Sequence, residues 1–272
     1  MLRLLIFIGS FPKNRYESLL LAEETISTIV LTSSILSINN TPKIFGKDRN
    51  ILMKWDLIIF DCDGVLVDSE AIGNKFIAEA LTDLGIETST DEALGEFLGG
   101  KLTQIKISVE KKLGKKLPDD WVDKIYEKQF AEFKRSLKPI TGIENVLRAL
   151  TKKDVLMCVG SNGPVNKMDV SLSVTGLAQY FSGRVFSADH VGIPKPAPDL
   201  YLYCAEQLNC IPQKCLVVED SPRGAMAGVS AGMTVFGYSG TDNNTDLLRA
   251  GCSTVSSKMT DLLDFVGVLE TQ

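Results

Sequence analysis

The chain has 272 residues, of which 44% are hydrophobic and 23% are charged, which is typical of a globular protein with one large domain or two ordinary ones. The net charge of −5 and the pI near 5.1 exclude a broad basic surface, so we expect no nucleic-acid partner. Six cysteines without a C-x-x-C spacing indicate reduced thiols rather than a disulfide framework or a zinc site, and therefore a cytoplasmic protein.

Residues 1–52 form an N-terminal extension whose status the sequence leaves open. Its apolar stretch, residues 2–8, is far shorter than the roughly 20 residues that a membrane span needs, and it is a poor match to a signal peptide. We therefore expect no membrane partner. Met53 directly precedes the first predicted strand, which favours the interpretation that the sheet needs nothing upstream.

A short apolar run, residues 55–60, predicts a buried strand that ends in Asp61 and Asp63. Two acids at positions i and i+2 project to the same side of an extended backbone, and their burial is costly unless a cation or a proton compensates. The pair therefore predicts a metal site. A calcium loop is the alternative, but it needs an oxygen ligand and a glycine where this chain has Val65 and Leu66.

The next segment, residues 69–139, has helical periodicity throughout, with helices predicted at 71–84, 91–98, 102–113 and 121–137. We interpret the aromatic stripe of the last helix as core. The segment amounts to an all-α insert. Gly100 and Lys101 form a turn with a cation at its edge, which we predict to contact the substrate; a helix end with a solvated lysine is the alternative.

From residue 142 onward, strands and helices alternate, which predicts a parallel sheet covered on both faces. The predicted strands are 155–159, 184–187, 215–218, 234–236 and 253–255, and the predicted helices are 143–150, 165–174, 199–208, 223–231, 247–250 and 261–266.

Polar residues follow several of these strands, at the sheet edge where open α/β folds place their chemistry. Ser161 and Asn162 offer a hydroxyl, an amide and nearby backbone N–H groups, which suits phosphate oxygens, although the pair taken alone is more typical of a helix N-cap. Lys195 lies between two prolines that stiffen its backbone. Glu219 and Asp220 add two adjacent acids, whose hard oxygen donors favour Mg²⁺ over zinc.

The stretch from Asp61 to Ser69 resembles the first motif of the haloacid dehalogenase-like superfamily, D-x-D-G-(V/T)-(L/I)-x-D-(S/T), and the later segments resemble its other three motifs in order. The resemblance implies an α/β fold: a Rossmann-like parallel sheet core at 53–68 and 140–272 with an all-α cap inserted at 69–139. It further implies that Asp61 is a nucleophile that becomes an aspartyl phosphate and that Asp63 is the general acid and base. The implied Mg²⁺ ligands are Asp61, the Asp63 carbonyl and Asp220, with Glu219 as an adjacent candidate.

These features predict a Mg²⁺-dependent phosphatase for a small phosphorylated metabolite such as a sugar or sugar-acid phosphate, in which Ser161, Asn162 and Lys195 hold the phosphoryl group. The branch of the superfamily that this chain resembles contains 6-phosphogluconate phosphatase and, more distantly, β-phosphoglucomutase. A phosphosugar mutase and a catalytically silent phospho-ligand scaffold are the alternatives. The mutases carry a histidine where this chain has Gly73, and His190, the one histidine of the sequence, is interpreted as a surface loop residue, so hydrolysis is favoured. We expect a monomer or weak dimer.

Overall fold

The computed structural model describes residues 54–97, 101–240 and 244–268 of the chain. The N-terminal extension, residues 1–52, and Gly100 of the predicted substrate-contacting turn lie outside the described residues. Within the described ranges, no helix is both long enough and apolar enough to cross a membrane.

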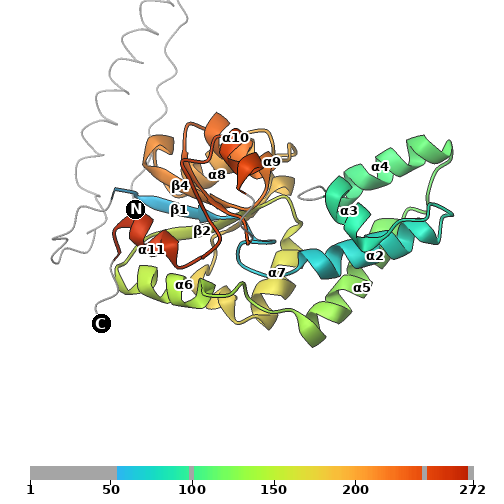
Figure 1. The fold of residues 1–272 in the computed structure, drawn as a ribbon, viewed down its shortest axis with the longest axis horizontal. Helices are drawn as coiled ribbons and strands as arrows, with labels where there is room; N and C mark the ends of the chain where they lie inside the picture. Colours follow the sequence, from blue (N-terminus) through green and yellow to red (C-terminus); the bar gives the residue numbers. More distant parts are fainter. Residues whose placement is uncertain (1–53, 98–100, 241–243, 269–272) are drawn as a thin grey trace, which may run out of the picture. The chain divides into compact units, whose positions relative to one another are not determined.

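Among the described residues, six parallel strands form one sheet in the order β3-β2-β1-β4-β5-β6 (Figure 1). Their bounds are β1 Leu57–Phe60, β2 Met157–Ser161, β3 Val185–Ser187, β4 Cys215–Glu219, β5 Thr234–Tyr238 and β6 Thr254–Ser256. The predicted α/β class is therefore confirmed. β1 lies between β2 and β4, so the chain that leaves β1 emerges in the middle of the carboxyl edge.

Alternate residues of β1 pack on opposite faces of the sheet, as the two-residue period of a strand requires. Ile58 and Phe60 face a core shared with α6 (Ile143–Lys152), α7 (Val165–Val174) and α11 (Asp261–Val266). Leu57 and Ile59 face a core shared with α8 (Asp199–Gln207), α9 (Pro222–Ser230) and α10 (Thr245–Arg249). Both faces are covered, which explains why this strand is apolar at every position.

Four helices lie between β1 and α6 in the described sequence and pack around a core of their own. They are α2 (Glu70–Thr82), α3 (Thr90–Phe97), α4 (Leu102–Leu113) and α5 (Trp121–Ser136). We call them the cap. Its two connections to the sheet run side by side, because Asp68 N–H donates to Lys138 O at 3.0 Å and Ile140 N–H donates to Leu66 O at 3.0 Å.

Two strands extend further toward their carboxyl ends than the sequence predicts, because their last residues are polar and yet pair with the neighbouring strand. β2 reaches Ser161, which pairs with Ser187 of β3, and β4 reaches Glu219, which pairs with Gly237 of β5. β2 also begins later than predicted, because Asp154 adopts a positive φ of 53° and Val155 N–H still bonds to Leu150 O of α6. Site residues are thus part of the sheet ladder itself, which holds them more firmly than a loop would.

Candidate active site

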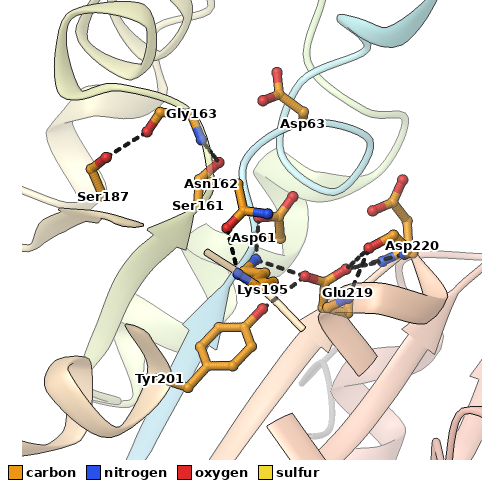
Figure 2. A network of polar contacts seen from close by, with 12 residues as sticks. Asp61, Asp63, Ser161, Asn162, Gly163, Ser187, Lys195, Tyr201, Glu219 and Asp220 are labelled. Atoms are coloured by element: carbon orange, nitrogen blue, oxygen red, sulfur yellow. Dashed lines mark hydrogen bonds and ion pairs between the residues drawn. The ribbon is translucent and has the colours of Figure 1, made fainter. Parts of the chain in front are cut away.

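Side chains from several strand ends converge on one cleft, and the cap supplies its other wall. The described lining includes all the predicted core site residues, namely Asp61, Asp63, Ser161, Asn162, Lys195, Glu219 and Asp220, together with Lys101 of the cap. Figure 2 shows Lys195 at the centre of this group, between Asp61 and Glu219.

Lys195 is 3% exposed and ties the nucleophile candidate to the acid pair. Its Nζ donates to Asp61 Oδ1 at 2.6 Å and to Glu219 Oε1 at 2.7 Å. Its backbone N–H donates to Asn162 Oδ1 at 2.9 Å, which joins the phosphate-binding loop to the same network. Burial acts to lower the pKa of Lys195, but the two carboxylates outweigh it and raise the pKa above its ordinary value, so the ammonium remains charged.

Glu219 is held by the protein through both carboxylate oxygens. Oε1 accepts hydrogen bonds from Lys195 and, at 2.8 Å, from the Tyr201 hydroxyl. Oε2 accepts from the backbone N–H groups of Asp220 and Ser221, both at 3.1 Å, and from Ser221 Oγ at 3.0 Å. A carboxylate with this many donors is a rigid anchor for Lys195, and it has little remaining capacity to bind a metal ion directly.

Three acids lie close enough to share one cation: a carboxylate oxygen from each of Asp61, Glu219 and Asp220 lies within 4.8 Å of the others. Burial raises the pKa of Asp61 to about 7 despite Lys195, and burial together with the charge of Glu70 raises the pKa of Asp220 well above its ordinary value. An unionised Asp61 could not act as a nucleophile at neutral pH, so Asp61 and Asp220 fit a divalent cation that keeps both of them ionised.

Gly64 lets the turn after β1 approach these acids. Its φ is +77°, a conformation that favours glycine, and a Cβ at this position would lie 2.0 Å from Asp220 Oδ2. Val65 and Leu66 follow it, and both side chains are fully buried and apolar. A calcium loop would need an oxygen ligand and a glycine at these two positions, so that alternative is wrong.

Asp63 has partners different from those of Asp61. Its Oδ2 accepts a hydrogen bond from Lys167 Nζ at 2.7 Å, and its Oδ1 accepts one from Ser69 Oγ at the start of the cap. Burial alone would raise the pKa of Asp63, but Lys167 and the hydrogen bonds outweigh it and lower the pKa. A carboxylate so placed at the boundary between sheet and cap is accessible to a substrate that enters between them.

Ser161 and Asn162 lead into a loop that is organised before α7 begins. Gly163 N–H donates to Ser161 Oγ at 3.1 Å, and Ser187 Oγ of β3 donates to Gly163 O at 2.7 Å. The N-cap of α7 is Pro164, with no side-chain capping bond, so the helix-cap interpretation of Ser161 and Asn162 is wrong.

Lys101 lines the cleft and forms an ion pair with Asp189, in the short helix η3 (Ala188–His190) of the sheet domain. The alternative of a solvated lysine is therefore wrong, because its side chain is 17% exposed. His190 is exposed in the same short helix, where its Nδ1 accepts a hydrogen bond from Ser187 N–H at 3.0 Å. It does not line the cleft.

Several lining residues were not assigned a role from the sequence. Lys167 contacts Asp63, Glu70 lies near both Asp63 and Asp61, and Gln129 and Tyr126 of α5 line the cap side. The sequence predicts that Tyr126 belongs to the core. It packs against the cap core and also lines the cleft. The position of Lys167 in the sequence could have indicated its place in the site, because it lies in the first turn of the helix that follows the phosphate loop.

The fold and the site together define an α/β enzyme with a helical cap, whose lysine and acids are arranged to act on an anionic group. Residues 58–238 match the family described as haloacid dehalogenase-like hydrolase. The chain is 33% identical over 204 residues to 6-phosphogluconate phosphatase of Escherichia coli K12, covering 75% of this chain and 91% of that protein.

Solved structures of similar proteins support the same family. A conserved haloacid dehalogenase-like protein of unknown function from Agrobacterium tumefaciens C58 is 34% identical, with a TM-score of 0.65, covering 78% of this chain and 98% of that one. A HAD family hydrolase from Deinococcus radiodurans R1, with bound phosphate and sodium, is 30% identical with a TM-score of 0.64, covering 81% and 100%. The chain belongs to the haloacid dehalogenase-like hydrolase family. Within that family it is a phosphoric monoester hydrolase, which confirms the enzyme class predicted from the sequence.

Proposed function

We propose that the protein is a Mg²⁺-dependent phosphatase that hydrolyses phosphate monoesters of small sugars or sugar acids through an aspartyl-phosphate intermediate. The observation that carries the proposal is the position of Asp61, which adjoins a buried cation, Lys195, and a cluster of acids suited to a metal ion. The likeness to a 6-phosphogluconate phosphatase supports the substrate class. The proposed ligand is therefore a small phosphorylated metabolite, and six free cysteines support a cytoplasmic location.

In the first proposed step, an Asp61 oxygen attacks phosphorus, the bond from phosphorus to the ester oxygen breaks, and Asp63 in its protonated form gives its proton to that oxygen. In the second step, Asp63 takes a proton from water as the water oxygen attacks phosphorus, and the bond to Asp61 breaks to release phosphate. Lys195, Ser161 and Asn162 hold the phosphoryl oxygens. Mg²⁺, bound by Asp61, Asp220 and the Asp63 carbonyl, supplies charge neutralisation when present.

Removal of divalent metal should abolish activity. We expect the protein with Mg²⁺ to release phosphate from sugar and sugar-acid phosphates in a broad ester panel, to lose this activity in excess EDTA, and to regain it when Mg²⁺ is added back. Phosphate release measured in these three conditions tests the metal and the reaction together. A protein that hydrolyses nothing in the panel with Mg²⁺ would instead support the silent phospho-ligand scaffold.

Replacement of Asp63 by Asn should slow turnover by about 10² to 10⁴-fold, the range that general acid–base catalysis supplies. The amide keeps the shape of the side chain but cannot give or take the proton. Steady-state kcat with a sugar-phosphate substrate measures the effect. Esters with a good leaving group, such as p-nitrophenyl phosphate, need less protonation and should lose less; an equal loss for both ester types would contradict the assigned role.

Transfer of the phosphoryl group to water, rather than to a sugar hydroxyl, is the expected outcome of turnover. No histidine is among the described lining residues, and the cleft is lined by Gly73 and Asn74 at the position where the family resemblance would place the histidine of a mutase. We expect incubation with sugar 1-phosphates and a trace of bisphosphate to give stoichiometric free phosphate and no 6-phosphate isomer. Fast isomerisation with little free phosphate would establish the mutase alternative.

A further inference from the structure

Lys167 enters the cleft from the first turn of α7 and has no part in the proposed steps above. Its Nζ donates to Asp63 Oδ2 at 2.7 Å, and its side chain is 16% exposed. A largely buried ammonium is costly unless something anionic lies beside it. Asp63 satisfies that need in the structure, but the bond uses one of the three N–H donors of the ammonium.

The neighbours of Gly163 locate Lys167 relative to the reacting group. A Cβ on Gly163 would lie 3.5 Å from Lys167 Cδ, 3.5 Å from Ser161 Oγ and 3.7 Å from Asp63 Oδ2. The stem of Lys167 therefore lies close to both the phosphate loop and the proposed acid. Because Asp63 is proposed to reach the ester oxygen, the ammonium at its side lies within reach of the leaving group.

The other two cations of the described lining are paired with acids other than Asp63. Lys195 is held by the buried carboxylates of Asp61 and Glu219, and Lys101 is paired with Asp189 of η3. Lys167 is thus the described lining cation that contacts the proposed acid and base.

The cap wall around this position carries the acid Glu70 of α2, which interacts with Lys167, and a neutral amide from α5. Gln129 of α5 is 3% exposed, its Nε2 donates to Gly73 O at 3.2 Å, and its Oε1 has no hydrogen-bond partner among the described residues. Buried amide oxygens without a partner are rare in proteins, and this residue lines the cleft. An ammonium group and an amide oxygen that still lacks a donor could together bind a polyhydroxy chain that carries one negative charge.

We propose that Lys167 is a specificity-determining residue whose ammonium binds a carboxylate on the leaving group, so that phosphate monoesters of polyhydroxy acids are preferred over those of alditols. This inference rests on the proposed phosphatase function. The carboxylate accepts the donors of Lys167 that Asp63 does not use, while Asp63 turns to the ester oxygen.

Two substrates that differ only at the far end test the proposal: 6-phosphogluconate, and sorbitol 6-phosphate, in which a CH₂OH group replaces the carboxylate. We expect the wild-type kcat/KM to be about 10- to 100-fold higher for the acid, the range of a hydrogen bond to a charged group. Lys167→Met should remove this preference mainly through a higher KM for the acid, and Lys167→Arg should retain most of it. Lys128→Met, an exposed lysine on α5, is the control and should behave as wild type.

A wild-type protein without preference, or a Lys167→Met variant that loses activity equally on both substrates, would overturn the proposal and leave Lys167 as a positioning residue for Asp63. Turnover of neither ester would refute the proposed function instead. If Lys167→Met fails to fold, competitive inhibition of the wild type decides: gluconate should inhibit and sorbitol should not, and equal effects of the two would again overturn the assignment.

Discussion

Asp61→Asn is expected to abolish turnover, with a loss on the order of 10⁴-fold or more, while the protein remains folded. The amide keeps the size of the carboxylate, and its oxygen can still accept the hydrogen bond from Lys195 Nζ, which spans 2.6 Å in the structure. It cannot, however, attack phosphorus to form the acyl phosphate. The variant should therefore bind substrate without cleaving it.

Three measurements check this expectation: steady-state phosphate release, circular dichroism with thermal unfolding, and acid-quenched mass spectrometry for a covalent phosphate. The wild type should show a mass increase on a peptide containing Asp61 and the variant should not. Asp56→Asn, an exposed acid before β1, is the control and should leave all three readouts unchanged. Retained turnover in Asp61→Asn would refute the nucleophilic mechanism altogether.

The parts of the fold that could be predicted from the sequence are those governed by local pattern. The apolar runs and their turn residues predicted the helices α4 and α7 at their observed bounds. The motifs also predicted which polar side chains gather at the carboxyl edge, because strand ends in a parallel sheet must meet there. Asp61 and Lys195, which are 134 residues apart in the sequence, were expected in one site for that reason.

The remaining contacts depend on tertiary packing that a single sequence does not encode locally. Tyr201 looks like an ordinary apolar position of α8, yet its hydroxyl holds Glu219. Lys167 looks like an exposed residue in the first turn of a helix, and its contact with Asp63 spans 104 residues. The strand ends were misjudged for a related reason: whether Ser161 belongs to β2 depends on pairing with Ser187 of β3, not on its own propensity.

Gly224→Ala is expected to destabilise the protein and to displace Glu219 in the active site. Gly224 lies at the start of α9, where Ser221 is the N-cap, and alanine at a helical position is normally more stable than glycine by about 1 kcal/mol. Here a Cβ would lie 1.6 Å from Glu219 Oε1 and 1.9 Å from its Cδ. Glu219 cannot move aside cheaply, because Lys195, Tyr201 and Ser221 hold it through hydrogen bonds.

The substitution should therefore lower the free energy of unfolding by about 3 to 5 kcal/mol, the cost of breaking a buried ion pair. Displacement of Lys195 should also reduce kcat on the order of 10² to 10³-fold, comparable with the loss of one oxyanion donor. Chemical denaturation and steady-state kinetics measure the two effects. Ser230→Ala, at the exposed end of the same helix, is the control and should change neither.

A double-mutant cycle separates this cause from a general disturbance of α9. In a Glu219→Ala background the obstructing carboxylate is absent, so Gly224→Ala should become neutral or stabilising, in line with the helix propensity of alanine. The reversal of sign is the decisive result, because it occurs only if the added methyl group acts through Glu219. If Gly224→Ala is equally destabilising in both backgrounds, the close approach of Glu219 does not explain why glycine is required at position 224.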